Sequence, residues 1–129
     1  MIQSVYVVNE GGETLASIPI GDFQIDEVLF GGFLSAIQMY SQRVSGKDLK
    51  ELSLENYRII LSKADRVFLV TIHDQDDKNA SQMNTKLSEL IEGTLGDVIT
   101  DETVELIREA ATEASNAFER ATDWASKML

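Results

Sequence analysis

The six residues from Val67 to Ile72 constrain the fold more than any other segment of this chain. They read VFLVTI, and a strand over them would carry apolar side chains on both of its faces. Such a strand must be buried on both sides, which places it near the middle of a β-sheet that is itself covered on both faces. The rest of the chain must therefore supply neighbouring strands and two separate covers.

Four further segments predict strands. Residues 2–9 are rich in β-branched and aromatic side chains, and the Gly11-Gly12 pair allows a tight turn into a second strand over 14–20. Pro19 cannot donate to a β-ladder, so the second strand should lie at an edge of the sheet. Two more strands are expected before the central one, a short one over 49–54 and another over 57–61.

Three segments predict helices, because their apolar residues recur every three or four positions. The first begins at the N-cap Asp26 and reaches Val44, and its predicted buried face is Leu29, Phe33, Ala36, Ile37, Tyr40 and Val44. The second spans 80–95, with Met83, Leu87, Leu90, Ile91 and Leu95 on one face. The third begins at Thr100 or Asp101 and reaches almost to Leu129, with the seam Val104, Ile107, Ala111, Ala114, Phe118, Ala121, Ala125 and Met128.

Together these elements predict an α+β fold in the order β-β-α-β-β-β-α-α. We expect one domain over 1–129, with a core over 1–99 and a long C-terminal helix over 100–129. A five-stranded antiparallel sheet, with the first helix on one face and the two C-terminal helices on the other, hides every apolar stripe. Tyr40 and Trp124 are expected to be partly buried anchors; if exposed, they would indicate an interface.

Charge and composition exclude several classes of protein. Eleven basic residues against 22 acidic ones give a net charge of −11, which disfavours binding to nucleic acid or to anionic lipid. The apolar runs are too short to cross a bilayer, and the N-terminus resembles no secretory signal, so we expect a cytoplasmic protein without membrane insertion. Residues 47–66 nevertheless carry five bases against four acids. This basic segment is either a solvated sheet surface or a docking patch for an acidic partner.

The sequence offers little for catalysis, for a cofactor or for a metal. The chain has no cysteine, and its one histidine, His73, adjoins Asp74 in a predicted strand, where neighbouring side chains point to opposite faces. The acidic run from Asp74 to Asp77 fails the calcium-loop pattern, because it lacks the glycine at the sixth position and the glutamate at the twelfth. Gly11-Gly12 is not followed by the residues of a phosphate-binding loop. We therefore expect no catalytic, cofactor or metal site, and no enzyme.

The Gly31-Gly32 pair is unusual because it lies within the first predicted helix, where glycine is unfavourable. Each glycine there costs up to about 1 kcal/mol relative to alanine. Such a cost indicates close approach of another backbone, either the protein's own sheet or a partner's helix.

The element order and two segments resemble the longin domain. Residues 2–20 resemble the first longin hairpin, and DEVLFGGFLSAIQMY over 26–40 is similar to the first helix of small archaeal stand-alone proteins of the longin–roadblock superfamily. The shared pattern here is Gly32-Phe33-Leu34-Ser35-Ala36-Ile37. The resemblance implies a longin-like (profilin-like) fold and a non-enzymatic platform. Such platforms bind small Ras-like GTPases or pair with another longin or roadblock subunit, using the first helix and an adjacent edge strand.

The resulting hypothesis is a protein–protein interaction module of trafficking or signalling. Its candidate partner-binding residues lie on the first helix and in the basic segment: Gly31, Gly32, Ser35, Met39, Lys47, Lys50 and Arg58. Two alternatives stay open. One is a self-associating scaffold or trafficking-coat subunit that forms a homodimer, and the other is a profilin-like or PAS-like sensor of a small ligand, which would need a cavity between helix and sheet.

Overall fold

The computed structural model describes residues 1–23, 25–64, 66–92 and 99–113. Its elements, in chain order, are β1 (Ile2–Asn9), β2 (Thr14–Pro19), α1 (Glu27–Ser45), β3 (Glu51–Ser53), β4 (Tyr57–Ala64), β5 (Val67–Asp74) and α2 (Ala80–Ile91). Residues 101–113 form a further helix. The predicted helix positions at Leu95 and beyond residue 113, Trp124 among them, lie outside the described residues.

One antiparallel sheet organises the molecule, with strand order β2-β1-β5-β4-β3. The central position of β5 confirms what its two apolar faces predicted, and the edge position of β2 agrees with Pro19. In register, Val7 of β1 lies opposite Leu69 of β5 and Ala16 of β2.

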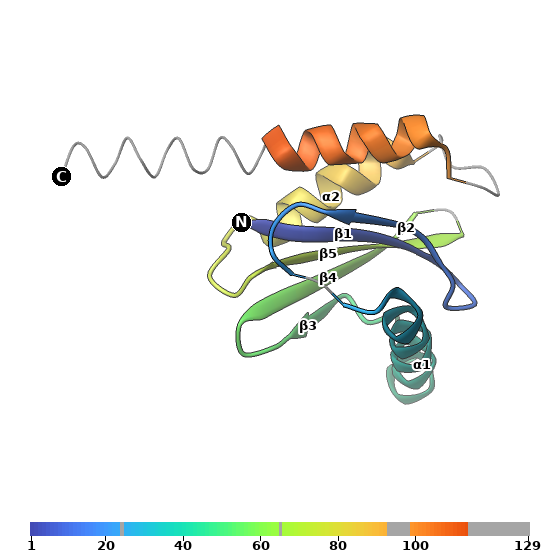
Figure 1. Ribbon diagram of the computed structural model, residues 1–129. Helices are drawn as coiled ribbons and strands as arrows, with labels where there is room; N and C mark the ends of the chain where they lie inside the picture. The colour runs from blue at the N-terminus through green and yellow to red at the C-terminus, as the bar shows by residue number, and fades with distance from the viewer. Residues whose placement is uncertain (24, 65, 93–98, 114–129) are drawn as a thin grey trace.

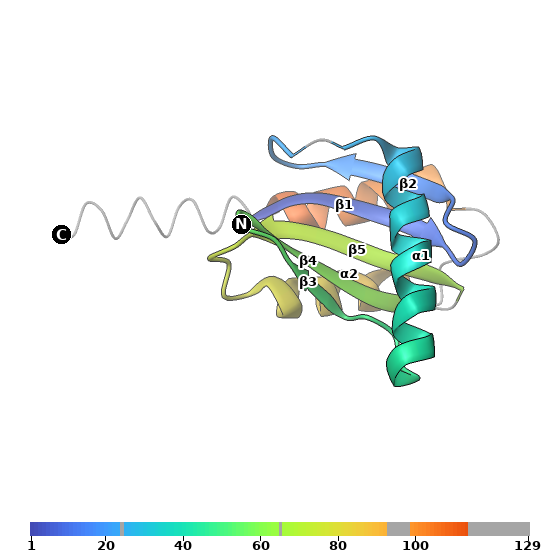
Figure 2. The same cartoon turned by 90° about the horizontal axis from the view of Figure 1, so that it is seen from below.

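The sheet has an unequal cover on each face. Helix α1 lies on one face, and α2 and the helix over 101–113 lie on the other (Figure 1). Seen from the α1 side, that helix crosses the strands and leaves much of the sheet uncovered (Figure 2). The described helices are therefore distributed over the two faces as the sequence predicted.

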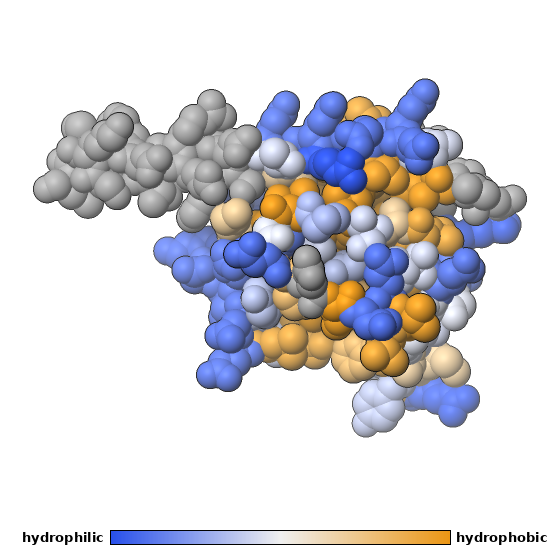
Figure 3. Space-filling model, in the orientation of Figure 1, coloured by the Kyte–Doolittle hydropathy of each residue, from blue (hydrophilic) through white to orange (hydrophobic). Residues whose placement is uncertain are grey.

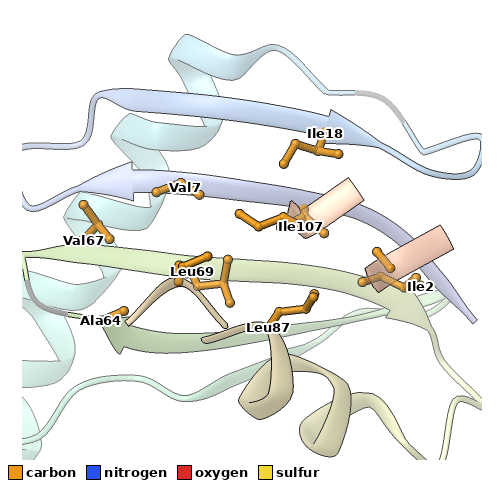
Figure 4. Close-up of a cluster of buried hydrophobic side chains, with 11 residues drawn as sticks. Ile2, Val7, Ile18, Ala64, Val67, Leu69, Leu87 and Ile107 are labelled. Atoms are coloured by element: carbon orange, nitrogen blue, oxygen red, sulfur yellow. The ribbon is translucent and has the colours of Figure 1, made fainter. Parts of the chain in front are cut away.

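Each face of the sheet has its own buried cluster. On the α2 side, Ile18, Leu69, Leu87 and Ile107 are among the side chains that close the gap between sheet and helices (Figure 4). On the α1 side, the rings of Tyr6 and Phe30 meet with centroids 4.9 Å apart, within a cluster that also holds Leu34, Leu61, Val70 and Ile72. Burying one such aliphatic or aromatic side chain stabilises a fold by about 1.5–3 kcal/mol.

The predicted buried face of α1 is wrong. Its buried residues are Phe30, Gly31, Leu34 and Gln38, whereas the predicted set is exposed at Leu29, Phe33, Ala36, Tyr40 and Val44, and Ile37 is only partly buried. Apolar residues occur on both sides of this helix, so periodicity alone does not show which side meets the sheet.

Contacts with residues elsewhere in the chain set the rotation of α1 about its axis. A Cβ on Gly31 would lie 2.1 Å from the carbonyl oxygen of Gly12, so the helix touches the β1–β2 turn where only glycine fits. The expected close approach is thus to the chain's own hairpin, while a Cβ on Gly32 meets nothing within 4 Å. Further along, the Gln38 amide donates to the Leu49 carbonyl at 3.0 Å and accepts from the Leu49 N–H at 2.7 Å.

Helix α2 is shorter than predicted. It ends at Ile91 with Glu92 as C-cap, and Leu90 is exposed, while Leu87 and Ile91 are buried as expected. The buried face also includes the polar Asn84, whose amide donates to the Ile60 carbonyl at 3.1 Å. A buried polar residue of this kind is tolerated because its hydrogen bonds are made.

Candidate functional site

The most distinctive surface of the molecule is the solvent side of α1. We call Leu29, Phe33, Ala36, Tyr40 and Val44 the outer stripe. All five are exposed, Leu29 by 72% and Tyr40 by 69%, on the side of the helix away from the buried Leu34 and Gln38. Apolar residues reach the surface at the α1 end of the molecule (Figure 3, lower right). A contiguous apolar surface of this kind marks an interaction site more often than chance exposure.

The two ends of α1 carry opposite charges. Asp26 and Glu27 stand at the N-terminal end, where Asp26 caps the helix by accepting from the Val28 and Leu29 N–H groups at 3.0 and 3.1 Å. Arg43 lies in the last turn, and Lys47 follows the C-cap. The outer stripe is therefore uncharged along its length and bounded by an acidic and a basic end.

The predicted partner-binding residues fall into three groups. Gly32 and Met39 are exposed on α1, Ser35 is partly buried, and Gly31 is buried against the hairpin. Lys47 and Lys50 are exposed between α1 and β3. Arg58 is held apart from both groups, because its guanidinium binds Glu51 and the Asp77 carbonyl, each at 2.7 Å. That these residues contact a partner stays a prediction.

Two cavities flank the end of β4. The first, the helix cavity, is about 420 Å³, lies beneath α1 and is lined largely by apolar groups, including those of Leu34, Met39 and Phe68. The second, the edge cavity, is about 390 Å³ and lies on the α2 side, where Ser62 and Asn84 are among its lining residues. Sequence reasoning found neither cavity, because both are bounded by residues that are far apart in the chain.

His73 is fully buried and forms hydrogen bonds with both ring nitrogens. Nδ1 lies 2.9 Å from an Asp77 carboxylate oxygen, and Nε2 lies 2.8 Å from the Thr71 hydroxyl. Burial lowers the pKa of His73, although the hydrogen bond to Asp77 partly opposes that effect. Desolvation alone would raise the pKa of Asp77, but hydrogen bonds from the Met1 amine, the Asn79 N–H and His73 outweigh it and lower that pKa.

The His73 ring forms its hydrogen bonds with groups of the protein itself. His73 lines neither cavity, and both of its nitrogens are occupied by protein groups, so a substrate would find no free ring atom. Within the described ranges, no cluster of three or more His, Asp or Glu side chains is placed to hold a metal ion. The same part of the chain contains no helix that is both long and apolar enough to span a membrane.

Comparison with solved structures identifies the fold. The gliding protein MglB of Thermus thermophilus superposes with a TM-score of 0.56 at 11% identity, over 87% of this chain and 79% of that one. MglB in a tetrameric arrangement superposes with a TM-score of 0.50 at 13% identity, over 88% and 79%. The chain shares its fold with MglB.

A Roadblock/LC7 domain from Streptomyces avermitilis is also similar, with a TM-score of 0.49 and 14% identity over 70% of this chain and 82% of that one. The α+β longin–roadblock type of fold, which the sequence predicted, is confirmed by the likeness to MglB. No protein-family model matches the chain, and neither does any curated protein.

The outer stripe is the surface feature that sequence reasoning misassigned to the core. Its periodicity is visible in the sequence, but periodicity of this kind predicts core. A second, narrower set of nonpolar residues on the other side of the same helix could have corrected this assignment. That set is Phe30, Gly31 and Leu34. A helix that is apolar on two sides has more apolar surface than one sheet can cover.

Proposed function

We propose that this chain is a non-enzymatic protein–protein interaction module whose docking surface is the outer stripe of α1. The observation that carries the proposal is the exposure of Leu29, Phe33, Tyr40 and Val44 on one side of a helix whose other side already packs on the sheet. Leaving these side chains in water forgoes about 25 cal/mol per Å² of apolar surface, which a partner recovers on binding.

The partner we propose is a small Ras-like GTPase or another longin or roadblock subunit, met in the cytoplasm in trafficking or signalling. The fold shared with MglB and the longin resemblance support this class of partner. Platforms of the longin type use the first helix and an adjacent edge strand. The two edge strands here are β2 and β3, and we propose that α1 acts together with β3, the strand that follows it in the chain. The exposed Lys47 and Lys50 lie in the connection between these two elements and suit an acidic rim on the partner.

Paired substitutions on α1 test this surface. Tyr40→Glu places a charge in the middle of the outer stripe, and Val28→Glu makes the same change at a residue that is 82% exposed but lies beside the stripe. Calorimetric titration with candidate GTPases, loaded with GDP or with a GTP analogue, and with candidate longin or roadblock subunits measures binding. We expect Tyr40→Glu to weaken binding at least about tenfold, as substitution of an interface aromatic does, and Val28→Glu to leave it unchanged.

Either of two results would reject this function. One is that no candidate binds at tens of micromolar. The other is that Tyr40→Glu binds as tightly as the unmodified chain, because the stripe would then not be the docking surface. Both variants should keep the unmodified chain's melting temperature, since both side chains point into water.

A second copy of the chain is the alternative partner, and the pattern of α1 favours it specifically. When two antiparallel copies of the helix cross near Ala36, Leu29 of one copy meets Val44 of the other, and Phe33 meets Tyr40. The acidic end with Glu27 then faces the basic end with Arg43. Such a two-fold contact is self-complementary in both shape and charge.

Light scattering distinguishes self-association from binding to a different protein. A homodimer that becomes monomeric in Tyr40→Glu, but not in Val28→Glu, supports pairing through the outer stripe. A clean monomer at tens of micromolar excludes it and leaves the GTPase or subunit partner as the remaining occupant. The MglB structure in a tetrameric arrangement shows that a protein of this fold assembles, and self-association is proposed here by analogy.

A further inference from the structure

The edge of β4 extends well beyond its neighbour β3. Strand β4 has eight residues, but β3 has three, which pair only with Arg58, Ile59 and Ile60. One more bond follows, from the Leu61 N–H to the Lys50 carbonyl at 2.8 Å. From there to its end, the outer side of β4 has no strand beside it among the described residues, while its inner side stays paired with β5.

The backbone of Lys63 points away from the sheet at this open edge. Tyr57 and Leu61 use their backbone groups on the β3 side, and outward-facing residues alternate along an antiparallel strand. Lys63 therefore presents an N–H and a carbonyl outward, and no described strand pairs with them. A donor and an acceptor on one residue are what an added antiparallel strand engages.

The helix cavity and the edge cavity meet at this edge. Both are lined by Asp48, Leu61, Lys63 and Phe68, but one opens on the α1 face and the other on the α2 face. Successive side chains of an extended chain point to opposite faces of a sheet. A strand added beside Lys63 would thus place one side chain in the helix cavity and the next in the edge cavity.

The unpaired Ser62 hydroxyl indicates that a bound segment has a polar side chain on the α2 side of the sheet. It is buried, lines the edge cavity, and has no hydrogen-bond partner among the described residues. Buried hydroxyls are nearly always paired, because an unpaired one lowers the stability of the fold. A hydroxyl or amide group from a bound segment would satisfy it.

We propose that the β4 edge at Lys63 binds an extended segment of a partner protein by strand addition. The segment runs antiparallel to β4. Its central residue, opposite Lys63, is apolar and enters the helix cavity, and the residues on either side are small and polar, one of them pairing with Ser62. Among the lining residues, Glu10 and Glu51 are already paired with Lys63 and Arg58. Arg43 and Lys50 have no ion pair in the described structure and outnumber Asp48, which accepts only from the Gln42 amide, so the segment carries acidic residues at its ends. The outer stripe takes no part in this contact. Arg43 and Lys50 serve as flanking charges in both proposals, so the peptide measurements below use the backbone of Lys63 to test this one separately.

A capped heptapeptide tests the proposal, with one leucine at its centre, two threonines on each side of it and one glutamate at each end. The control peptide is identical except for an N-methyl group on the central leucine, which removes one of the two backbone hydrogen bonds and blocks close approach. Titration into the ¹⁵N-labelled full chain, followed by amide hydrogen exchange, reports binding and its location. We expect the unmethylated peptide to slow exchange at the Lys63 amide, and the methylated one to bind about three- to tenfold more weakly or worse.

Variants of the protein give a second, independent measurement. Lys63→Pro removes the outward N–H, whereas Lys63→Ala keeps it, so only the proline should abolish binding. Ser62→Ala should weaken binding without lowering the melting temperature, because the hydroxyl has no partner to lose within the described structure. If Lys63→Pro fails to fold, the peptide pair on the unmodified chain still decides the question.

Three outcomes would overturn the proposal. The peptide does not bind at millimolar concentration, or both peptides bind equally well, or binding leaves exchange at Lys63 unchanged. Equal binding would indicate an apolar contact in the helix cavity alone, without strand addition.

Discussion

Gly31 and Gly32 are adjacent in α1, yet the structure predicts opposite effects for the same substitution. In Gly31→Ala, the new Cβ would lie 2.1 Å from the Gly12 carbonyl oxygen and 3.1 Å from the Thr14 hydroxyl. In Gly32→Ala, the new Cβ meets nothing within 4 Å. Comparing the two substitutions therefore separates the effect of helix propensity on stability from the effect of close packing.

The magnitude follows from two opposing effects. Alanine gains up to about 1 kcal/mol over glycine inside a helix, and this gain applies equally at both positions. At position 31 the clash is with backbone, in a turn held by the Gly12 N–H to Asn9 carbonyl bond at 3.1 Å, so the helix must move away. Overpacking costs about 1–3 kcal/mol, and a contact this short against backbone belongs at the upper end of that range. Subtracting the helix gain of about 1 kcal/mol leaves an expected net loss of about 2 kcal/mol for Gly31→Ala.

Thermal and urea denaturation followed by circular dichroism measure the difference. We expect Gly32→Ala to melt a few degrees above the unmodified chain and Gly31→Ala to melt roughly 8 °C below it, because 1 kcal/mol shifts the melting temperature of such a domain by about 4 °C. The urea slope m should be the same in both variants and the unmodified chain, because neither substitution changes the surface that unfolding exposes. If Gly31→Ala is as stable as Gly32→Ala, the hairpin does not set the position of α1.

Two further predictions concern the buried polar groups between the sheet and α2. Asn84→Ala should lower the free energy of unfolding by about 2–3 kcal/mol in urea titration. The substitution leaves buried acceptors, such as the Thr71 hydroxyl 2.9 Å from Nδ2, without their donor. Thr85→Ala on the exposed side of α2 is the control and should change the free energy of unfolding by less than about 0.5 kcal/mol. Equal effects would show that the Asn84 bonds contribute nothing net. Folding lowers the pKa of His73 below its unfolded value of 6.5. The stability that neutral His73 contributes is therefore fully present above pH 6.5, and it is lost as the pH falls through the pKa of the folded state. Stability should therefore decline as the pH falls from about 7.5 through the unfolded value of 6.5, and His73→Gln should reduce that decline. Asp77 adds its own loss only in more acidic solution, below its ordinary pKa of 3.8. A flat profile over that range would contradict a neutral, buried histidine.

Much of the fold could be predicted because it depends on local patterns. VFLVTI placed β5 at the centre, Pro19 placed β2 at an edge, and Asp26 marked the start of α1. Each of these depends on one physical rule: side-chain alternation, a missing N–H, or a capping carboxylate. The two-sided arrangement of helices then followed from counting apolar stripes.

The candidate site could not be predicted in the same way. The set Leu29, Phe33, Tyr40 has the period of a core face, and Gln38 is polar and would be expected at the surface. Only contacts with distant residues reversed both expectations: Gly12 approaches Gly31, and the Leu49 backbone satisfies Gln38. The open edge at Lys63 likewise depends on where β3 stops, and the sequence predicted a longer strand over 49–54.

Local patterns in the amino-acid sequence were enough to predict which segments become strands and helices, and that a sheet must lie between two covers, because periodicity and backbone chemistry act within a few residues. Tertiary structure alone decided which side of α1 is buried and which backbone groups of β4 stay unpaired. Both depend on contacts between residues far apart in the chain, and their geometry forms only when the sheet has assembled. The surfaces proposed here for binding are therefore the places where local pattern and final packing disagree.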